Sequence, residues 1–285
     1  MVARQAHNLK VVGSNPTPAT NIRLNVKKND LIYYTIMEYQ SITLAAGLGS
    51  RLNDLTKHIP KSLLTVKSKS IIEHQLDAFH KNNIHKNIIV TGYCSEKFTI
   101  KNCIYVKNEN YKKNNILNSL FYAKKFMNTN TVVSYSDILF KHEIISELIA
   151  DHNDVTLVVD KNWRDNYSGR LLHPMEEAEK VCLGADQIIN IGKKINNLDA
   201  NAEFIGLLKL SKRGCILFKK YFELAKENFS NKKFYESDDF SNAYITDFIK
   251  YLIENDIKIN FLYIDSPWME IDTKEDFLKS QKFFE

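Results

Sequence analysis

The chain has 285 residues, enough for one large hydrophobic core or for one core with a small appended lobe. Charged residues make up 26% and hydrophobic residues 44% of it, as in an ordinary globular protein, and no apolar run is long enough to span a membrane. The formal net charge of +5 is spread along the chain without a basic stripe, so the sequence does not indicate a nucleic-acid-binding protein.

The first 36 residues differ in composition from the rest of the chain. Residues 1–29 contain no acidic residue, and a glycine and two prolines interrupt any amphipathic helix. The apolar core of a secretory signal is missing as well. We therefore expect residues 1–36 to be a leader that is disordered or not native to the protein. The native start is then Met37, and residues 37–285 form a single domain.

A glycine-rich loop follows the first predicted strand, which covers residues 40–45. Residues 44–61 read LAAGLGSRLNDLTKHIPK and place Gly47 and Gly49 on either side of a single leucine. Glycine accepts positive φ and lets a backbone come close to a ligand, and N–H groups leaving a strand form a concave anion site. We therefore interpret this loop as the binding site of a nucleoside triphosphate whose α-phosphorus is attacked by another anion.

Two commoner glycine loops do not fit this stretch. A Walker loop has four residues between its glycines and a Lys-Ser/Thr pair after the second glycine. A dinucleotide-binding loop needs a third small residue where Leu52 stands, and an acid about 20 residues further on, where residues 67–70 contain none. Arg51 and Lys61 instead place two fixed positive charges beside the loop, which suits a triphosphate.

From residue 38 onward predicted strands and helices alternate, which favours an α/β fold with mainly parallel strands. Strands are predicted at 40–45, 87–91, 103–106, 131–135, 155–160, 187–192, 202–210 and 257–264. Helices are predicted at 70–82, 115–127, 142–150, 212–229, 239–254 and after Thr273. Residues 161–179 are polar and irregular, and we interpret residues 161–210 as a β excursion from the main sheet that faces the substrate. Ser211 is the predicted N-cap of the helix that follows it, and Thr273 and Asp276 have nearly the spacing of a capping box.

Two aspartates follow strand-like segments of this α/β pattern. Asp137 follows the strand at 131–135, and Asp272 follows the strand-like run that begins at residue 268. Ligands of open α/β sheets bind beyond the carboxyl ends of the strands, so both aspartates are expected at the edge that carries the glycine loop. Carboxylates there would hold Mg²⁺, which neutralises the charge that develops during transfer of a nucleotidyl group.

Residues 39–285 resemble the nucleotidyltransferase family, and most of all its phosphocholine and 2-aminoethylphosphonate cytidylyltransferase branch. The resemblance is carried by LAAGLGSRL with its later Pro-Lys pair, by NNILNSL, by YSDILF and by Glu-Ile-Asp-Thr at residues 270–273. It implies a three-layer fold with a mixed, mostly parallel central sheet and a small β excursion over the site. It further implies a cytoplasmic enzyme whose product serves to decorate cell-surface glycans or lipids.

The resemblance also implies roles for individual residues. The catalytic residues are Lys61, Arg51 and Asp137, and the ligands of Mg²⁺ are Asp137 and Asp272. Asn115 and Ser119 lie near the cytosine base. The full set of expected nucleotide-binding residues is Leu44, Ala45, Ala46, Gly47, Gly49, Ser50, Asn115 and Ser119.

The acceptor substrate is expected to be a small anion that carries an ammonium group. Aromatic faces hold such a group at about 0.5 to 2 kcal/mol each, aided by a nearby acid. Trp163, Tyr167 and Trp268 stand in polar segments, and Glu270 follows the last of them. Arg170 is the expected contact of the acceptor's phosphate or phosphonate. Ordinary core packing remains an open alternative for each aromatic residue.

These residues favour a Mg²⁺-dependent cytidylyltransferase that transfers CMP from CTP to phosphocholine or 2-aminoethylphosphonate and releases pyrophosphate. Two alternatives stay open, a sugar-1-phosphate nucleotidyltransferase and a non-catalytic nucleotide-binding homologue. The Glu-Lys-Pro segment typical of the sugar enzymes is replaced by residues 191–194, which leaves the role of Lys193 undefined. The sequence does not fix the oligomeric state, although a homodimer is compatible with it.

The cysteines and histidines are assigned no chemistry. Without zinc spacing or a secretory signal, the cysteines indicate reduced thiols in a cytosolic protein. They are Cys94, Cys103, Cys182 and Cys215. The histidines share no ligand spacing and no companion nucleophile. Those after residue 36 are His58, His74, His80, His85, His142, His152 and His173.

Overall fold

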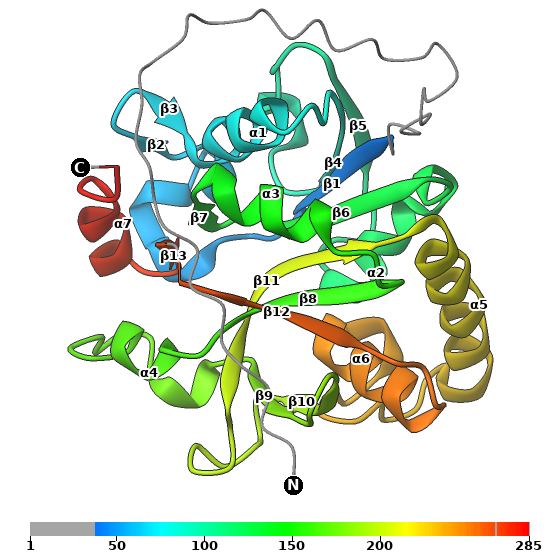
Figure 1. The fold of residues 1–285 in the computed structure, drawn as a ribbon. Coiled ribbons are helices and arrows are strands. Elements are labelled where there is room, and N and C mark those ends of the chain that lie inside the picture. Colours follow the sequence, from blue (N-terminus) through cyan, green and yellow to red (C-terminus); the bar gives the residue numbers. More distant parts are fainter. Residues whose placement is uncertain (1–37, 266, 285) are drawn as a thin grey trace, which may run out of the picture. The chain divides into compact units, whose positions relative to one another are not determined.

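The computed structural model describes residues 38–265 and 267–284, and the predicted leader lies outside this part of the chain. The strands of its main sheet are β1 (Tyr39–Ala45), β4 (Lys86–Thr91), β5 (Cys103–Lys107), β6 (Asn130–Tyr135), β8 (Val155–Asp160), β9 (Lys180–Leu183), β10 (Ile188–Gly192), β11 (Ala202–Leu210) and β12 (Asn260–Ile264). Within the described residues these nine strands run in the order β10-β9-β11-β6-β1-β4-β5, with β8 also pairing with β11 and β12 pairing with β8 (Figure 1).

The direction of the strands confirms the predicted mixed, mostly parallel sheet. β1 is parallel to both β4 and β6, and β4 is parallel to β5. β11 runs antiparallel to β6 and β8, so it interrupts the parallel arrangement in the middle of the sheet. Two short ladders lie outside the main sheet, β13 (Trp268–Glu270) with β7 (Ile138–Phe140), and β2 (Thr65–Val66) with β3 (Lys69–Ser70).

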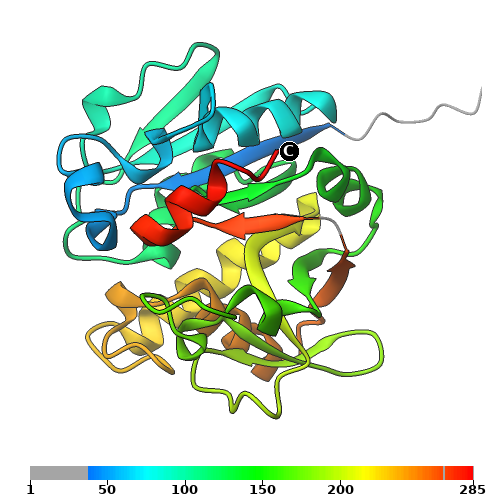
Figure 2. The ribbon, with the colours of Figure 1, turned by 90° about the vertical axis from the view of Figure 1, so that its left-hand side faces the viewer.

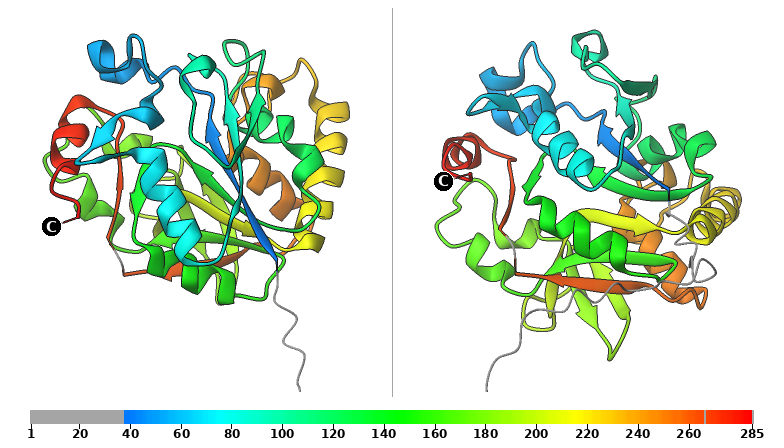
Figure 3. Two further views of the ribbon diagram at one scale, coloured as in Figure 1. Left: turned by 90° about the horizontal axis from the view of Figure 1, so that it is seen from above. Right: turned by 45° about the horizontal axis from the view of Figure 1, so that its top comes forward.

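Helices cover both faces of the sheet and complete three layers. The helices are α1 (Ile71–Lys81), α2 (Ile116–Tyr122), α3 (His142–Ala150), α4 (Trp163–Asn166), α5 (Lys212–Phe229), α6 (Ile245–Glu254) and α7 (Lys274–Ser280). Figures 1 and 3 show α1 and α3 on one face and α2, α5 and α6 on the other. Successive strand residues point to opposite faces, so Val132 packs with α1 and α3 while Val133 packs with α2, α5 and α6.

The predicted helix starts agree with the observed caps at two places. The Ser211 side chain accepts a hydrogen bond from the Gly214 N–H at the start of α5, and Thr273 forms a reciprocal capping box with Asp276 at the start of α7. Two predicted helices are too long. The helix predicted at 115–127 ends at Tyr122 and continues as a short 3-10 turn, while α6 begins six residues later than the predicted start at 239.

The predicted β excursion is present after β8. It comprises α4, an irregular loop and the β9–β10 hairpin, and this hairpin pairs with the first residues of β11. In Figure 2 this region lies along the lower edge of the molecule, away from the blue β1 strand. β9 was not predicted, because its four residues lie between polar loops and offer too short a pattern. In the described part of the chain no helix is long and apolar enough to cross a membrane.

β11 changes its pairing partners at Gly206. Its first residues pair with β9, whereas residues from Leu207 onward pair with β6. Gly206 has a φ of +81°, and the register with β8 shifts next to it. A Cβ atom at this glycine would lie 2.5 Å from the Tyr135 ring, so the missing side chain also makes room for that ring.

Candidate active site

Three residues predicted for the active site meet at the carboxyl edge of the sheet. Asp137 follows β6, and Asp272 follows β13, which is held beside β7. The Ile271 N–H donates to the Asp137 carbonyl over 2.8 Å, which fixes the two aspartate segments together. Lys61 Nζ lies 2.8 Å from Asp137 Oδ2 and 2.5 Å from Asp272 Oδ1. One ammonium group therefore bridges both predicted metal ligands.

Gly49 in the glycine loop adopts a left-handed backbone conformation. Gly49 has a φ of +62°, and its carbonyl accepts hydrogen bonds from the Leu52 N–H over 3.1 Å and the Thr56 hydroxyl over 2.8 Å. A Cβ at Gly49 would lie 3.0 Å from Lys61 Cβ, so the glycine allows the lysine segment to pass close by. Gly47 differs, since a Cβ there would meet nothing within 4 Å. Space for a ligand is thus available beside Gly47.

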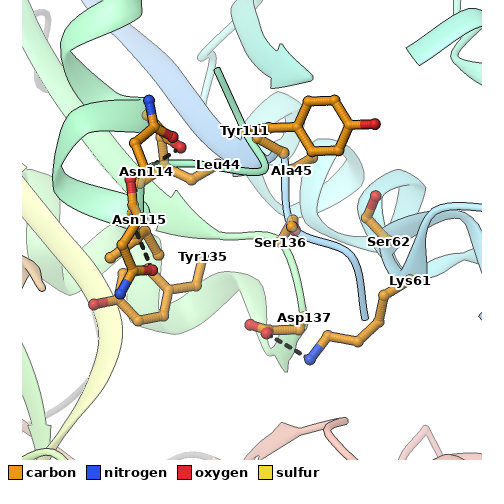
Figure 4. A pocket seen from close by; sticks show the side chains of 14 residues that line it. Leu44, Ala45, Lys61, Ser62, Tyr111, Asn114, Asn115, Tyr135, Ser136 and Asp137 are labelled. Carbon is orange, nitrogen blue, oxygen red and sulfur yellow. Dashed lines mark hydrogen bonds and ion pairs between the residues drawn. The ribbon is translucent and has the colours of Figure 1, made fainter. Parts of the chain in front are cut away.

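A first cavity lies between this loop, the start of α2 and the end of β6 (Figure 4). Most of the predicted nucleotide-binding residues line it, while Gly49 and Ser50 do not. The lining residues are Leu44, Ala45, Ala46, Gly47, Lys61, Ser62, Tyr111, Asn114, Asn115, Ile116, Ser119, Tyr135, Ser136 and Asp137. The cavity carries few charges and many amide and hydroxyl groups. We name it the nucleotide cavity, because most of the predicted nucleotide-binding residues line it.

The two residues predicted near the base are already held by the protein. Asn115 caps α2, since its side chain accepts from the Ile116 N–H over 2.8 Å and donates to the Asn242 carbonyl over 3.1 Å. The Ser119 hydroxyl accepts from the Asn108 amide over 2.9 Å. Both side chains therefore have fixed orientations in the wall of the nucleotide cavity. Tyr111, a lining residue that was not predicted from the sequence, lies apart from Asn115 in Figure 4.

A second cavity opens on the other side of Asp137. Nine of its residues come from the segment 161–210 that was predicted as the β excursion, and the segment at 268–272 supplies Trp268, Glu270 and Asp272. The lining residues are Arg51, Asn115, Ile116, Tyr135, Asp137, Ile138, Tyr167, His173, Glu177, Glu179, Lys193, Glu203, Phe204, Ile205, Gly206, Tyr244, Trp268, Glu270 and Asp272. Four of these residues, Asn115, Ile116, Tyr135 and Asp137, also line the nucleotide cavity. We name the second space the acceptor cavity, because it adjoins the nucleotide cavity at Asp137.

The charges between the two cavities fix the protonation of Lys61 and Asp272. Burial alone would lower the pKa of the Lys61 ammonium, but the charges of Asp137 and Asp272 raise that pKa above its usual value. Burial alone would raise the pKa of Asp272, but the bonds and charges of His173, Lys61 and Arg51 lower it. Lys61 is therefore positive and Asp272 negative throughout the physiological pH range.

Two predicted acceptor contacts lie elsewhere. Trp163 is wholly buried and packs against Tyr167, Ala178 and Ala200, so it is a core residue rather than a contact for an acceptor. Arg170 is held by Asp276, at 2.9 Å from Nε and 3.0 Å from Nη2.

Arg170 also faces a different space. Together with Trp268, Glu270 and Asp276 it lines a smaller neighbouring cavity, and it does not line the acceptor cavity. Its guanidinium is committed to a carboxylate of its own chain, which leaves it unsuited to hold an acceptor phosphate.

His173 is a site residue that the sequence analysis dismissed. It is only 4% exposed, and its Nδ1 lies 3.0 Å from Asp272 Oδ2 while its Nε2 lies 3.6 Å from Glu270. No spacing rule could find it, because it enters the site from an irregular loop. Glu203, by contrast, could have been predicted from the sequence, because it is a charged residue within the otherwise apolar first half of β11.

The acidic groups at the junction fit a divalent metal ion. Asp137 Oδ1 is buried and has no hydrogen-bond partner among the described residues, which leaves one carboxylate oxygen free for a ligand. His173, Glu270 and Asp272 offer further ligand atoms within 4.8 Å of one another. A set rich in carboxylate oxygens suits Mg²⁺. Asp137 and Asp272 thus meet the chemical requirement of the predicted metal site.

Comparison with known proteins adds independent information. The family model described as MobA-like NTP transferase domain matches residues 41–187. The chain is 32% identical over 250 residues to the CTP:phosphoglutamine cytidylyltransferase of Campylobacter jejuni, which covers 83% of this chain and 96% of that protein. It is 34% identical over 113 residues to the choline-phosphate cytidylyltransferase of Streptococcus pneumoniae, which covers 38% of this chain and 49% of that protein.

A solved structure of similar fold covers almost the whole described chain. It is the inositol-1-phosphate CTP transferase from T. maritima, with a TM-score of 0.67 and 21% identity over 87% of this chain and 97% of that one. At this identity the likeness concerns the fold alone. The three-layer arrangement predicted from the sequence is therefore that of known nucleotidyltransferases.

Proposed function

Because the chain belongs to the MobA-like NTP transferase family, we propose that it is a Mg²⁺-dependent cytidylyltransferase acting on a small phosphorylated acceptor that contains nitrogen. The enzyme transfers CMP from CTP to the acceptor phosphate and releases pyrophosphate. One observation carries this proposal, namely the nucleotide and acceptor cavities that adjoin at Asp137, with Lys61 between them. Two substrates can thus approach each other at a positive charge.

The reaction is an in-line displacement at the α-phosphorus of CTP. An acceptor phosphate oxygen forms a bond to this phosphorus while the bond to the pyrophosphate oxygen breaks. No general base is needed, because the acceptor oxygen is already anionic at neutral pH. Lys61 stays protonated, because the charges of Asp137 and Asp272 raise the pKa of its ammonium group more than burial lowers it. The protonated side chain stabilises the charge on the transferring group. Catalysis is then mainly positioning and charge neutralisation.

Asp137 and Asp272 would hold the Mg²⁺ ion. When bound, the ion neutralises phosphate charge and helps to align the triphosphate. The free oxygen of Asp137 supports this assignment, because a buried carboxylate oxygen without a partner is costly unless a ligand meets it. His173 orients Asp272 by a contact of 3.0 Å to its Oδ2.

The relatives and the cavity support this acceptor class. Phosphoglutamine and choline phosphate, named for the two relatives above, both contain nitrogen. Phosphoglutamine is the first candidate, because the relative named for it spans most of this chain. The phosphocholine and 2-aminoethylphosphonate predicted from the sequence remain candidates of the same class. The acceptor cavity supports this class with the aromatic side chains of Tyr135, Tyr167, Tyr244 and Trp268 next to several acids.

Pyrophosphate release by the purified full chain tests the proposal. CTP, UTP, ATP and GTP are each combined with Mg²⁺ and with phosphoglutamine, phosphocholine, 2-aminoethylphosphonate, inositol 1-phosphate or glucose 1-phosphate. We expect CTP with a nitrogen-containing acceptor to give the highest kcat/KM. A preference for glucose 1-phosphate would identify a sugar nucleotidyltransferase instead. Nucleotide binding without pyrophosphate from any pair would identify a non-catalytic homologue.

A further inference from the structure

The acceptor cavity contains acidic side chains that the transfer reaction does not use. Glu179 precedes β9 and Glu203 lies in β11, and both line the cavity. We name these two residues the acidic wall; Glu270 is not included, because it lies 3.6 Å from Arg170 and from His173. Burial raises the pKa of Glu179 to about 7. Two carboxyl groups in one buried wall are costly unless each meets a donor or a cation.

Glu203 is the less satisfied of the two residues of the acidic wall. The residue is 4% exposed, and one of its oxygens accepts a hydrogen bond from the Tyr167 hydroxyl. The other oxygen, Oε2, is buried and has no hydrogen-bond partner among the described residues. A buried carboxylate oxygen normally has at least one donor. A donor from a bound molecule would fill this place.

The cations near the wall are already paired with other acids, and Arg170 Nε lies 2.9 Å from Asp276. Lys193 Nζ lies 3.1 Å from Glu177, and Arg51 and Lys61 both contact Asp272.

Within the described residues, neither Glu179 nor Glu203 takes part in an ion pair with a side chain of the protein. Glu179 accepts a hydrogen bond from the Tyr135 hydroxyl over 3.1 Å, and Glu203 accepts one from Tyr167. Both donors are neutral phenols. The acidic wall therefore has donors from the protein but lacks a positive charge of its own.

We propose that the acidic wall binds a protonated amine that carries N–H groups on the acceptor, and that Glu203 discriminates this amine from a quaternary ammonium. This inference rests on the proposed function and narrows its acceptor class. An amine with N–H groups can donate to Glu203 Oε2, whereas a trimethylammonium group has no N–H to give. The aromatic rings of Tyr135, Tyr167 and Trp268 would attract either cation, so they do not discriminate.

The ionisation of Glu203 is consistent with this role. Burial raises the pKa of the Glu203 carboxyl well above its usual range, although the Tyr167 hydrogen bond opposes the shift. A bound ammonium would favour the charged carboxylate, so binding a cation and ionising Glu203 support each other.

Matched acceptors test the proposal on the wild-type full chain. Primary-amine and trimethylammonium alkyl phosphates are compared at equal spacers of two, three and four carbons, with alkyl phosphates of matching length that lack an ammonium group as references. We expect the primary amine to exceed both others by about tenfold or more in kcat/KM at the best spacer, as loss of one charged hydrogen bond implies. Equal or better turnover of the trimethylammonium series would overturn the proposal.

A charge-neutral variant assigns the effect to Glu203. Glu203→Gln keeps the side-chain volume, and we expect it to reduce the preference for the primary amine to about threefold or less. Glu223→Gln, an exposed substitution on α5, serves as the matched control and should keep the wild-type preference. A retained preference in a folded Glu203→Gln protein would contradict the assignment.

Calorimetric binding of the same phosphates separates this inference from the proposed function. Absence of pyrophosphate with every acceptor, including phosphoglutamine, would refute the cytidylyltransferase. The ranking of binding affinities would still decide whether the wall selects N–H groups. Equal affinities for the primary-amine and trimethylammonium phosphates would overturn the inference, whatever the outcome for turnover.

Discussion

The two cavities of the site are built in different ways. The nucleotide cavity is formed by short segments that follow strands of the parallel half of the sheet, and Lys61 and Asp137 are its charged side chains among the described residues. The acceptor cavity is assembled from the β excursion and the segment at 268–272, and it contains six acids. The cavity predicted for the nucleotide is thus built from loops that the sequence encodes locally, whereas the cavity predicted for the acceptor combines acids from distant segments.

The largest effect on turnover is expected at the junction of the two cavities, where Lys61 contacts Asp137. Lys61→Ala should lower kcat by about 10²- to 10³-fold, because a preorganised charge at the transferring phosphate is lost. The substitution should leave the fold intact by circular dichroism. Lys220→Ala, an exposed change on α5, is the control. Near-wild-type pyrophosphate release by the Lys61 variant would refute the assigned role.

Asp137→Asn tests whether the junction holds a metal. We expect about 10²-fold slower turnover and a tenfold or higher Mg²⁺ requirement, because one charged ligand oxygen is replaced by an amide. A Mg²⁺ titration of the initial rate measures both effects, and addition of EDTA to the wild-type enzyme should abolish pyrophosphate release. An unchanged Mg²⁺ dependence in the variant would assign Asp137 to positioning of Lys61 alone.

Trp268→Phe tests whether the two cavities bind different substrates, because Trp268 lines the acceptor cavity and not the nucleotide cavity. The indole N–H donates to Asp160 over 2.8 Å, and phenylalanine keeps a ring but loses this bond. We expect KM for the acceptor to rise about threefold to tenfold while KM for CTP stays within twofold of wild type. Steady-state kinetics with each substrate varied in turn gives both constants. A rise confined to KM for CTP would show that the cavities are assigned the wrong way round.

The smallest effect on turnover is expected at a buried ion pair outside both cavities. Lys209 is 1% exposed, and its Nζ lies 2.6 Å from Asp151 Oδ2. Lys209→Met should leave kcat unchanged but lower the free energy of unfolding at pH 7 by about 1–3 kcal/mol. Urea titrations of both proteins measure this difference.

The pH dependence of that difference follows from Asp151. Burial alone would raise the pKa of its carboxyl, but the hydrogen bonds from Lys209 and Thr156 lower it below the usual value. Stability from a lowered pKa is present above the unfolded value of about 3.9 and is lost as the pH falls through the folded pKa. The gap between wild type and Lys209→Met should therefore shrink below about pH 4. A gap that is constant down to pH 2 would exclude the carboxylate as its source.

The sequence was sufficient for the parts of the site that are encoded locally. The glycine loop, Lys61, Asp137 and Asp272 each lie in a short stretch whose chemistry can be read from neighbouring residues, and the structure brings the three charged groups together. Strand bounds were predictable where a long run of apolar residues marks the strand. β8 and β11 are examples, and both match their predicted residues.

The acceptor cavity was less accessible to sequence reasoning. Trp163 and Trp268 both stand in polar segments, yet only Trp268 lines the cavity. Trp163 is buried by Tyr167, Ala178 and Ala200, which come from separate parts of the chain, and no local pattern reports such packing. Glu179 likewise reaches the wall through the pairing of β9 with β11, and β9 was itself unpredicted.

The change of partners at Gly206 divides β11 into a part that lines the acceptor cavity and a part that supports the ladder behind the nucleotide cavity. Residues before the glycine belong to the β excursion and carry Glu203, whereas residues after it pair with β6, which leads to Asp137. Exchanges before Gly206 should therefore alter the acidic wall while the ladder behind the nucleotide cavity keeps its register. Chimaeras in which residues 161–205 are exchanged between relatives would show whether this segment determines the acceptor. Gly206 itself should be retained in such chimaeras, because any side chain there would strike the Tyr135 ring.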